Sequence, residues 1–88
     1  MRSKNKPAMT RKESAHVERV ADLPCIVCGS ESGTEVHEPY QGAWFISIPL
    51  CVQCHRGQDG WHGTRLRWSL HKMDELKAIN ETHKRLAA

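Results

Sequence analysis

Long apolar runs are missing from this sequence, and aromatic residues are few. No stretch approaches the roughly 20 apolar residues needed to cross a bilayer, so we expect no association with a membrane. Aromatic residues make up 6% of the 88 residues and hydrophobic residues 39%, which is a thin supply for a core. A single domain of this size buries too little surface to be comfortably stable without an additional cross-link such as a disulfide or a metal ion.

Basic residues are missing from the middle of the chain. Residues 23–55 hold three glutamates and no lysine or arginine, whereas six basic residues precede them and seven follow. Two basic flanks around an acidic centre suit a domain that touches phosphates, although ordinary solvated charges give the same pattern. Residues 1–9 show no apolar periodicity, which predicts a flexible basic arm in front of one domain over residues 10–88.

Four cysteines form two pairs with metal-ligand spacing. Each pair encloses two residues, and 22 residues separate the pairs. The predicted ligands of a structural Zn2+ ion are Cys25, Cys28, Cys51 and Cys54. Two disulfides of a secreted protein, or a redox-active cysteine pair, are the alternatives. The paired spacing favours zinc, and residues 1–14 lack the apolar segment of a signal peptide, so we expect a reducing cytoplasm.

Local patterns place a helix before the cysteines. Thr10 and Glu13 form a capping-box pattern that predicts a helix beginning near Arg11. Pro24 forbids its continuation, so the helix is expected to end near Asp22.

Two short strands and a short helix are predicted around the second cysteine pair. The strands are residues 35–37 and 44–48, which form a β-hairpin that Pro49 terminates. A short helix then presents Cys51 and Cys54 from its first turn. A zinc knuckle, a hairpin and a helix in this order make a treble clef, so the predicted fold is a small zinc-stabilised α+β domain with flanking N- and C-terminal helices.

An apolar stripe with helical spacing lies in the last third of the chain. Its members are Leu66, Leu70, Met73, Leu76, Ile79, His83 and Leu86. The stripe predicts a long helix from Thr64 that contributes to the core or to a dimer seam. A break over residues 72–74 is the alternative, because Asp74 and Lys77 can begin a second helix.

Three histidines fall near the predicted zinc knuckle without being needed for it. His37 lies in the first predicted strand, His55 directly follows the last cysteine, and His62 comes seven residues later. In a treble clef the first strand and the helix face each other, so these side chains are expected to converge on a second divalent ion. The alternatives are a helix cap or a zinc-supporting contact for His55 and a packed turn for His62.

These motifs together resemble the HNH endonucleases, which are also called ββα-metal nucleases. The resemblance rests on residues 23–29 (Leu-Pro-Cys-Ile-Val-Cys-Gly), the strand histidine His37, residues 48–55 (Ile-Pro-Leu-Cys-x2-Cys-His) and residues 61–63 (Trp-His-Gly). It is strongest toward small phage and prophage proteins related to recombination-enhancement nucleases. It covers about residues 23–75 and implies a ββα-metal core.

The resemblance implies a metal-dependent endonuclease that nicks or cuts DNA with low sequence specificity. His37 would be the general base, Glu38 would support the metal ion or its water, and His55 and His62 would bind the catalytic ion, which is Mg2+, Mn2+, Ni2+ or Zn2+. With one histidine in this place, the exchange of roles between His37 as ligand and Glu38 as base stays open.

The nucleic acid would be contacted by arginines beside the site. These are Arg56, Arg65 and Arg67. The chain departs from the family in lacking its middle asparagine, since its asparagines are Asn5 and Asn80 and the strand before Cys51 offers Ser47.

The partners implied are single- or double-stranded DNA and a strand-exchange recombinase, in the cytoplasm of a bacterial host. The alternative function is a non-catalytic treble-clef zinc module that binds nucleic acid or a protein through its basic flanks.

Overall fold

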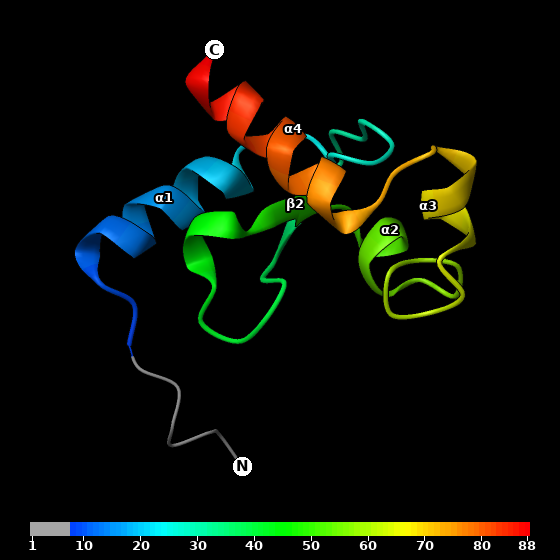
Figure 1. Ribbon diagram of the computed structural model, residues 1–88, viewed down its shortest axis with the longest axis horizontal. Coiled ribbons are helices and arrows are strands. Elements are labelled where there is room, and N and C mark those ends of the chain that lie inside the picture. The colour runs from blue at the N-terminus through cyan, green and yellow to red at the C-terminus, as the bar shows by residue number, and fades with distance from the viewer. Residues whose placement is uncertain (1–7) are drawn as a thin grey trace.

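The computed structural model describes residues 8–88, so the predicted arm over residues 1–9 lies almost wholly outside the described residues. The described chain is α+β, with a two-stranded antiparallel sheet and four α-helices (Figure 1). The elements are α1 (Arg11–Ala21), β1 (Glu35–His37), the 3-10 turn η1 (Trp44–Ile46), β2 (Ile48–Leu50), α2 (Val52–Arg56), α3 (Leu66–Leu70) and α4 (Glu75–Ala87). None of the helices over residues 8–88 has the length and apolar content needed to span a membrane.

The first helix begins and ends where the sequence predicts. The Thr10 hydroxyl accepts a hydrogen bond from the Glu13 backbone N–H, and the Glu13 carboxylate accepts one from the Thr10 N–H. Both donors would otherwise lack partners at the start of the helix. The helix closes at Asp22, two residues before Pro24. The capping box and the proline therefore fix α1 at both ends.

The second strand lies further along the chain than predicted. The expected strand over residues 44–48 is wrong, because Trp44–Ile46 forms a 3-10 turn and β2 is Ile48–Leu50. Phe45 makes an edge contact with the His16 ring of α1, so packing overrides its β-propensity.

Pro49 lies inside β2 and does not terminate it. It is opposite Val36 of β1, and its carbonyl accepts a hydrogen bond from the Ile26 N–H of the cysteine knuckle. The nitrogen and carbonyl of one strand residue point to the same side, so the missing N–H of Pro49 faces away from β1. A proline is therefore tolerated here without loss of a bond to β1.

The C-terminal stripe is split between two helices, so the alternative of a break is confirmed and the single long helix is wrong. Lys72 has a positive φ of 54°, and the Asp74 carboxylate caps α4 by accepting from the Lys77 N–H. The break turns Leu66, Leu70 and Leu76 to solvent, with exposures of 53%, 71% and 79%. The stripe does not form one continuous core face, because its residues no longer share a helix, but Met73 and Ile79 still pack against the buried core.

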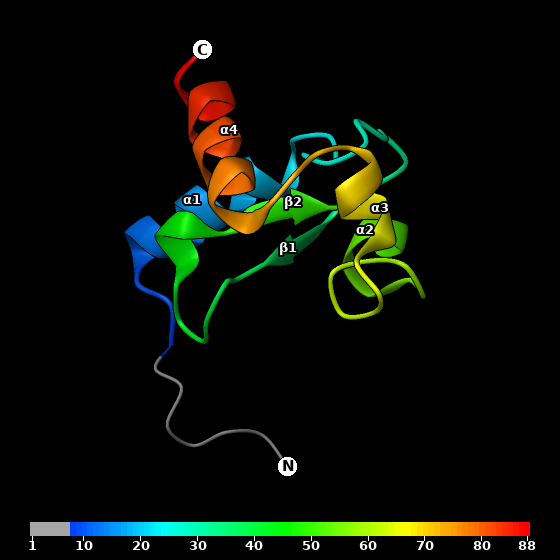
Figure 2. The ribbon, with the colours of Figure 1, turned by 45° about the vertical axis from the view of Figure 1, so that its right-hand side comes forward.

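The two pairs of helices occupy opposite ends of the sheet. Figure 2 shows α1 and α4 together at one end of the hairpin and α2 and α3 at the other. Arg19 of α1 donates to the Leu86 carbonyl of α4 at 2.6 Å, which joins the two terminal helices. The core runs between these ends and includes Ile48, Leu50, Trp68, Ala78 and the cysteines.

The junction of α1 and α4 contains a buried histidine nitrogen. His16 stacks near His83, with ring centroids 5.7 Å apart, and within residues 8–88 its Nε2 has no hydrogen-bond partner. Burial lowers the pKa of His16, and the neighbouring His83 and Arg19 lower it further. The unfolded chain therefore binds this proton more readily than the folded domain.

We predict that replacement His16→Phe makes the domain less sensitive to acid. Because folding lowers the pKa of His16, wild-type stability declines as the pH falls through about 6.5, the ordinary histidine value. Phenylalanine keeps a ring against Phe45 and cannot be protonated. Urea unfolding at pH 7.5 and pH 5.5 should show a larger loss of unfolding free energy for the wild type. Equal losses in the two proteins would remove His16 as a source of the pH dependence.

Candidate metal centre

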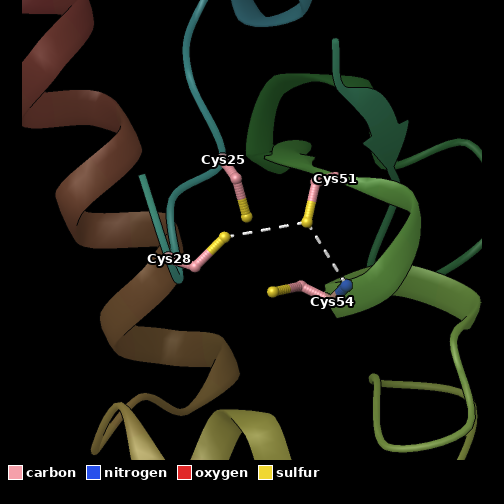
Figure 3. A group of neighbouring side chains, drawn as sticks. All are labelled: Cys25, Cys28, Cys51 and Cys54. Atoms are coloured by element: carbon pink, nitrogen blue, oxygen red, sulfur yellow. Dashed lines mark hydrogen bonds between the residues drawn. The ribbon is translucent and has the colours of Figure 1, made fainter. Parts of the chain in front are cut away.

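The four cysteine side chains meet at one point inside the domain. Figure 3 shows their sulfur atoms directed toward a common centre, and all four sulfurs lie within 4.8 Å of one another. The Cys28 and Cys51 sulfurs are 3.7 Å apart. A tetrahedral ion with sulfur ligands at about 2.3 Å places its sulfurs roughly 3.8 Å apart, so the spacing fits zinc. All four thiols are free, which agrees with a metal site and not with the disulfide alternative.

Backbone hydrogen bonds bring the two halves of this site together. The first pair lies on a turn in which the Gly29 N–H bonds to the Cys25 carbonyl, and Gly29 has a positive φ of 77°. The bond from Ile26 to Pro49 attaches this turn to β2. The second pair starts α2, where the Cys51 sulfur caps the helix by accepting from the Cys54 N–H at 3.4 Å. The sheet edge and the helix cap thus align the ligands.

Cys54 is the most enclosed of the four ligands. It is 0% exposed, and burial raises the pKa of its thiol, so a bare thiolate is unfavourable there. The Arg67 Nε donates to its sulfur at 3.4 Å, and the Trp68 Nε1 donates to its carbonyl at 2.8 Å. A bound cation and the Arg67 guanidinium would both stabilise the thiolate that metal binding requires.

The three predicted histidines also converge. His37 comes from β1, His55 from α2 and His62 from the loop after α2, and one ring nitrogen of each lies within 4.8 Å of the others. His37 is buried, His55 is partly buried and His62 is exposed. The cluster is therefore open to solvent on the His62 side, where a fourth ligand could enter.

Backbone pairing at the end of α2 places His62 next to His55. The carbonyls of Cys54 and His55 accept from the Trp61 and His62 N–H groups at 2.8 and 3.0 Å. The loop can fold back this tightly because Gly60 lies against the Gln53 and Cys54 backbone, where a side chain would clash. The packed-turn alternative for His62 describes its backbone, while its ring joins the cluster.

His37 and His55 are each held by a carboxylate on the side away from the cluster. The His37 Nε2 lies 3.1 Å from Glu75 Oε2, and the His55 Nδ1 lies 2.8 Å from Glu35 Oε1. An ionised carboxylate only accepts hydrogen bonds, so both of these ring nitrogens carry hydrogen. In neutral rings the other two nitrogens then carry lone pairs.

These two lone pairs face each other. The His37 Nδ1 and the His55 Nε2 are 3.3 Å apart, so two acceptors meet unless a cation lies between them. Burial, together with the neighbouring His55 and His62, lowers the pKa of His37 despite the Glu75 contact, which disfavours a doubly protonated ring. A tetrahedral ion with nitrogen ligands at about 2.0–2.1 Å separates them by roughly 3.3–3.4 Å. The donor set and its spacing therefore fit a divalent metal ion.

Glu38 lies outside this cluster of nitrogens. It follows His37 in the chain, and its Oε1 accepts a hydrogen bond from the Gly42 N–H at 3.1 Å. That contact orders the start of the loop between the strands. Glu38 is adjacent to the cluster in sequence but is not one of its three converging groups.

The three predicted DNA-binding arginines each have a partner. Arg56 forms a two-pronged ion pair with Glu35, with a shortest distance of 2.6 Å. Arg65 lies over the Trp61 ring at 3.6 Å from its centroid, and Arg67 contacts the Cys54 sulfur. Arg56 remains 64% exposed in this ion pair, so its guanidinium is accessible to another anion.

Sequence patterns missed Glu35 and Glu75. Glu35 stands two residues before His37, so strand alternation places both on one face, and this signal was available. Glu75 lies 38 residues from His37 and reaches it only because the chain breaks before α4. The contact of Glu75 with His37 depends on tertiary packing, which the spacing of residues in the sequence does not predict.

Comparisons of this chain with protein-family models, with curated proteins and with solved structures find no match.

We predict that removing zinc unfolds the domain. Structural zinc contributes on the order of 10 kcal/mol of binding free energy, against the few kcal/mol that a small core supplies. Circular dichroism of the reduced protein should lose its helical signal when a strong chelator is added and regain it with Zn2+. Cys54→Ser should show the same loss, whereas Val52→Ser, on an exposed position of the same helix, should not. Retention of the helical signal after complete zinc removal would contradict this prediction.

Proposed function

We propose that this protein is a metal-dependent DNA endonuclease of the HNH, or ββα-metal, type, which hydrolyses phosphodiester bonds with low sequence specificity. The observation that carries the proposal is the convergence of His37, His55 and His62, whose ring nitrogens lie within 4.8 Å of one another. A zinc module that served only as a scaffold would not need this second group of ligands.

The order of the elements supports the proposal. β1, β2 and α2 follow one another, with the cysteine knuckle attached to the edge of β2 and the start of α2. His37 belongs to the first strand and His55 to the helix, as a ββα-metal core requires. The treble-clef assignment rests on this order and on the four converging cysteines.

The geometry favours His37 as a ligand over His37 as the general base. Its Nδ1 faces the His55 nitrogen, and its Nε2 is occupied by Glu75. Neither ring nitrogen is then left to accept a proton from water. With His37 as a ligand, the exchange of roles makes Glu38 the base by its carboxylate chemistry, although its Oε1 contacts the Gly42 N–H outside the cluster.

The ion and the protein have separate tasks in this scheme. A divalent ion held by three imidazoles supplies a Lewis acid for a phosphate oxygen. Glu35 and Glu75 orient two of the rings, and Glu38 accepts the proton of the attacking water. Imidazole donors suit Zn2+ and Ni2+ better than Mg2+, which prefers oxygen ligands.

DNA would lie along the exposed side of the histidine cluster. Arg56 holds Glu35, which in turn holds His55, so a phosphate contact at Arg56 would be made directly beside the cluster. Arg65 stacks on the Trp61 ring within the loop that carries His62. Arginine forks suit phosphate oxygens, and contacts to phosphate carry no sequence information directly, in agreement with low sequence specificity.

We predict that wild-type protein nicks plasmid or cleaves single-stranded DNA with at least one of Zn2+, Ni2+, Mn2+ or Mg2+. His37→Ala should lower the rate by at least about 100-fold and remove the second ion, because it deletes a ligand. Glu38→Gln should lower the rate similarly and keep both ions. Cleavage assays and metal content per chain measure the two effects.

His71→Ala is the matched control, since His71 is an exposed histidine outside the cluster. Its rate and metal content should equal those of the wild type. If His37→Ala loses cleavage and keeps both ions, His37 is the base and Glu38 is not. Absence of cleavage with every ion and both forms of DNA would contradict the nuclease proposal.

The alternative is a non-catalytic zinc module that binds nucleic acid or a protein partner such as a strand-exchange recombinase. It predicts one ion per chain, held entirely by the cysteines. The carboxylate-backed histidines favour the nuclease, because such carboxylate–histidine pairs are typical of metal ligands.

A further inference from the structure

Glu75 is the first residue of the C-terminal helix and contacts the most deeply buried histidine of the cluster. Its Oε2 lies 3.1 Å from the His37 Nε2, and the two side chains are 28% and 7% exposed. Within residues 8–88, His37 is the only hydrogen-bond partner of the Glu75 side chain. The contact joins residues 38 positions apart, so packing and not chain proximity produces it.

We propose that Glu75 is a positioning residue of the histidine metal site, and that α4 is thereby a structural part of that site. The inference rests on the second ion of the proposed function. By accepting from Nε2, the Glu75 carboxylate keeps the His37 hydrogen on that atom and leaves the Nδ1 lone pair directed at the cluster. Without this contact His37 is free to carry its hydrogen on Nδ1, where it would block the ion.

The placement of Glu75 depends on how α4 begins. The positive φ of Lys72 turns the chain, and the Lys77 ammonium donates to the Lys72 carbonyl at 3.2 Å. Asp74 then caps the helix. Glu75 follows it as the first helical residue, and its carboxylate contacts His37. The buried residues Ala78 and Thr82 hold the helix in the domain.

Glu35 and Glu75 do the same task for different rings but differ in their other contacts. Glu35 is shared between His55 and Arg56, so its position is coupled to an exposed arginine. Glu75 contacts His37 from α4, whereas Glu35 contacts His55 from β1. The two facing imidazoles are therefore oriented by two independent parts of the fold, and loss of Glu75 should leave the His55 ring in place.

The test is titration of the second site in full-length protein whose cysteine site is already filled with zinc. Ni2+ or Zn2+ is added to wild type, Glu75→Ala, Glu75→Gln and the control Glu81→Gln. Loss of an outer carboxylate partner weakens metal affinity by about 10- to 100-fold. We expect a rise of this size in Kd for Glu75→Ala, a smaller rise for Glu75→Gln, whose amide oxygen can still accept, and no change for Glu81→Gln.

Glu81 is a suitable control because it lies on the same helix, pairs with Lys84 and is not part of the group formed by His37, His55 and His62. The content of cysteine-bound zinc should be equal in all four proteins, which excludes loss of folding as the cause.

A second readout is independent of DNA cleavage. Nitrogen NMR of the His37 ring, before the second ion is added, should show hydrogen on Nε2 in the wild type and a mixture of both tautomers in Glu75→Ala. An unchanged Kd in Glu75→Ala, hydrogen on Nδ1 in the wild type, or no second ion in the wild type would overturn the inference. If the ion and the Glu75 effect are found but no DNA is cleaved, the nuclease proposal fails while the positioning role stands.

Discussion

The convergence of four cysteine sulfurs is the constraint on which the other parts of the domain depend. It attaches the turn at Cys25–Gly29 to the edge of β2 and to the start of α2, which are both short elements. Helix α2 has five residues, too few to be stable alone. Its position is fixed because Cys51 and Cys54 lie at its beginning.

This constraint extends directly to the histidines. His55 follows Cys54 on α2, and the carbonyls of these two residues accept from Trp61 and His62. The same turn of helix therefore orients a sulfur ligand, one imidazole and the loop that carries another. β1 supplies His37 and Glu35 to the same place through its pairing with β2. Disturbance of the cysteine site should consequently reach the histidine site through the backbone, without direct contact between the two groups of ligands.

Features set by local chemistry were predictable from the sequence. The capping box at Thr10, the stop before Pro24, the strand 35–37 and the two cysteine pairs depend on residues close together in the chain, and the structure has them as expected. The meeting of His37, His55 and His62 was predictable because the order strand, strand, helix leaves few ways to arrange them.

Features set by tertiary packing were not predictable in this way. The residues Trp44–Ile46 have strong β-propensity, yet contact with α1 holds them in a 3-10 turn. Pro49 was expected to end a strand, but its carbonyl and missing N–H both face the knuckle, so it fits within one. The partnership of Glu75 with His37 follows from the break between α3 and α4, whose position decides which residue reaches the site.

We propose that one small domain holds two metal ions with different ligands, sulfur at one site and nitrogen at the other. Anomalous diffraction from crystals of protein loaded with Zn2+, collected on both sides of the zinc absorption edge, tests it most directly. Two peaks are predicted, one surrounded by Cys25, Cys28, Cys51 and Cys54 and the other by His37, His55 and His62. A single peak at the cysteines, in crystals soaked with excess Zn2+, would contradict the account.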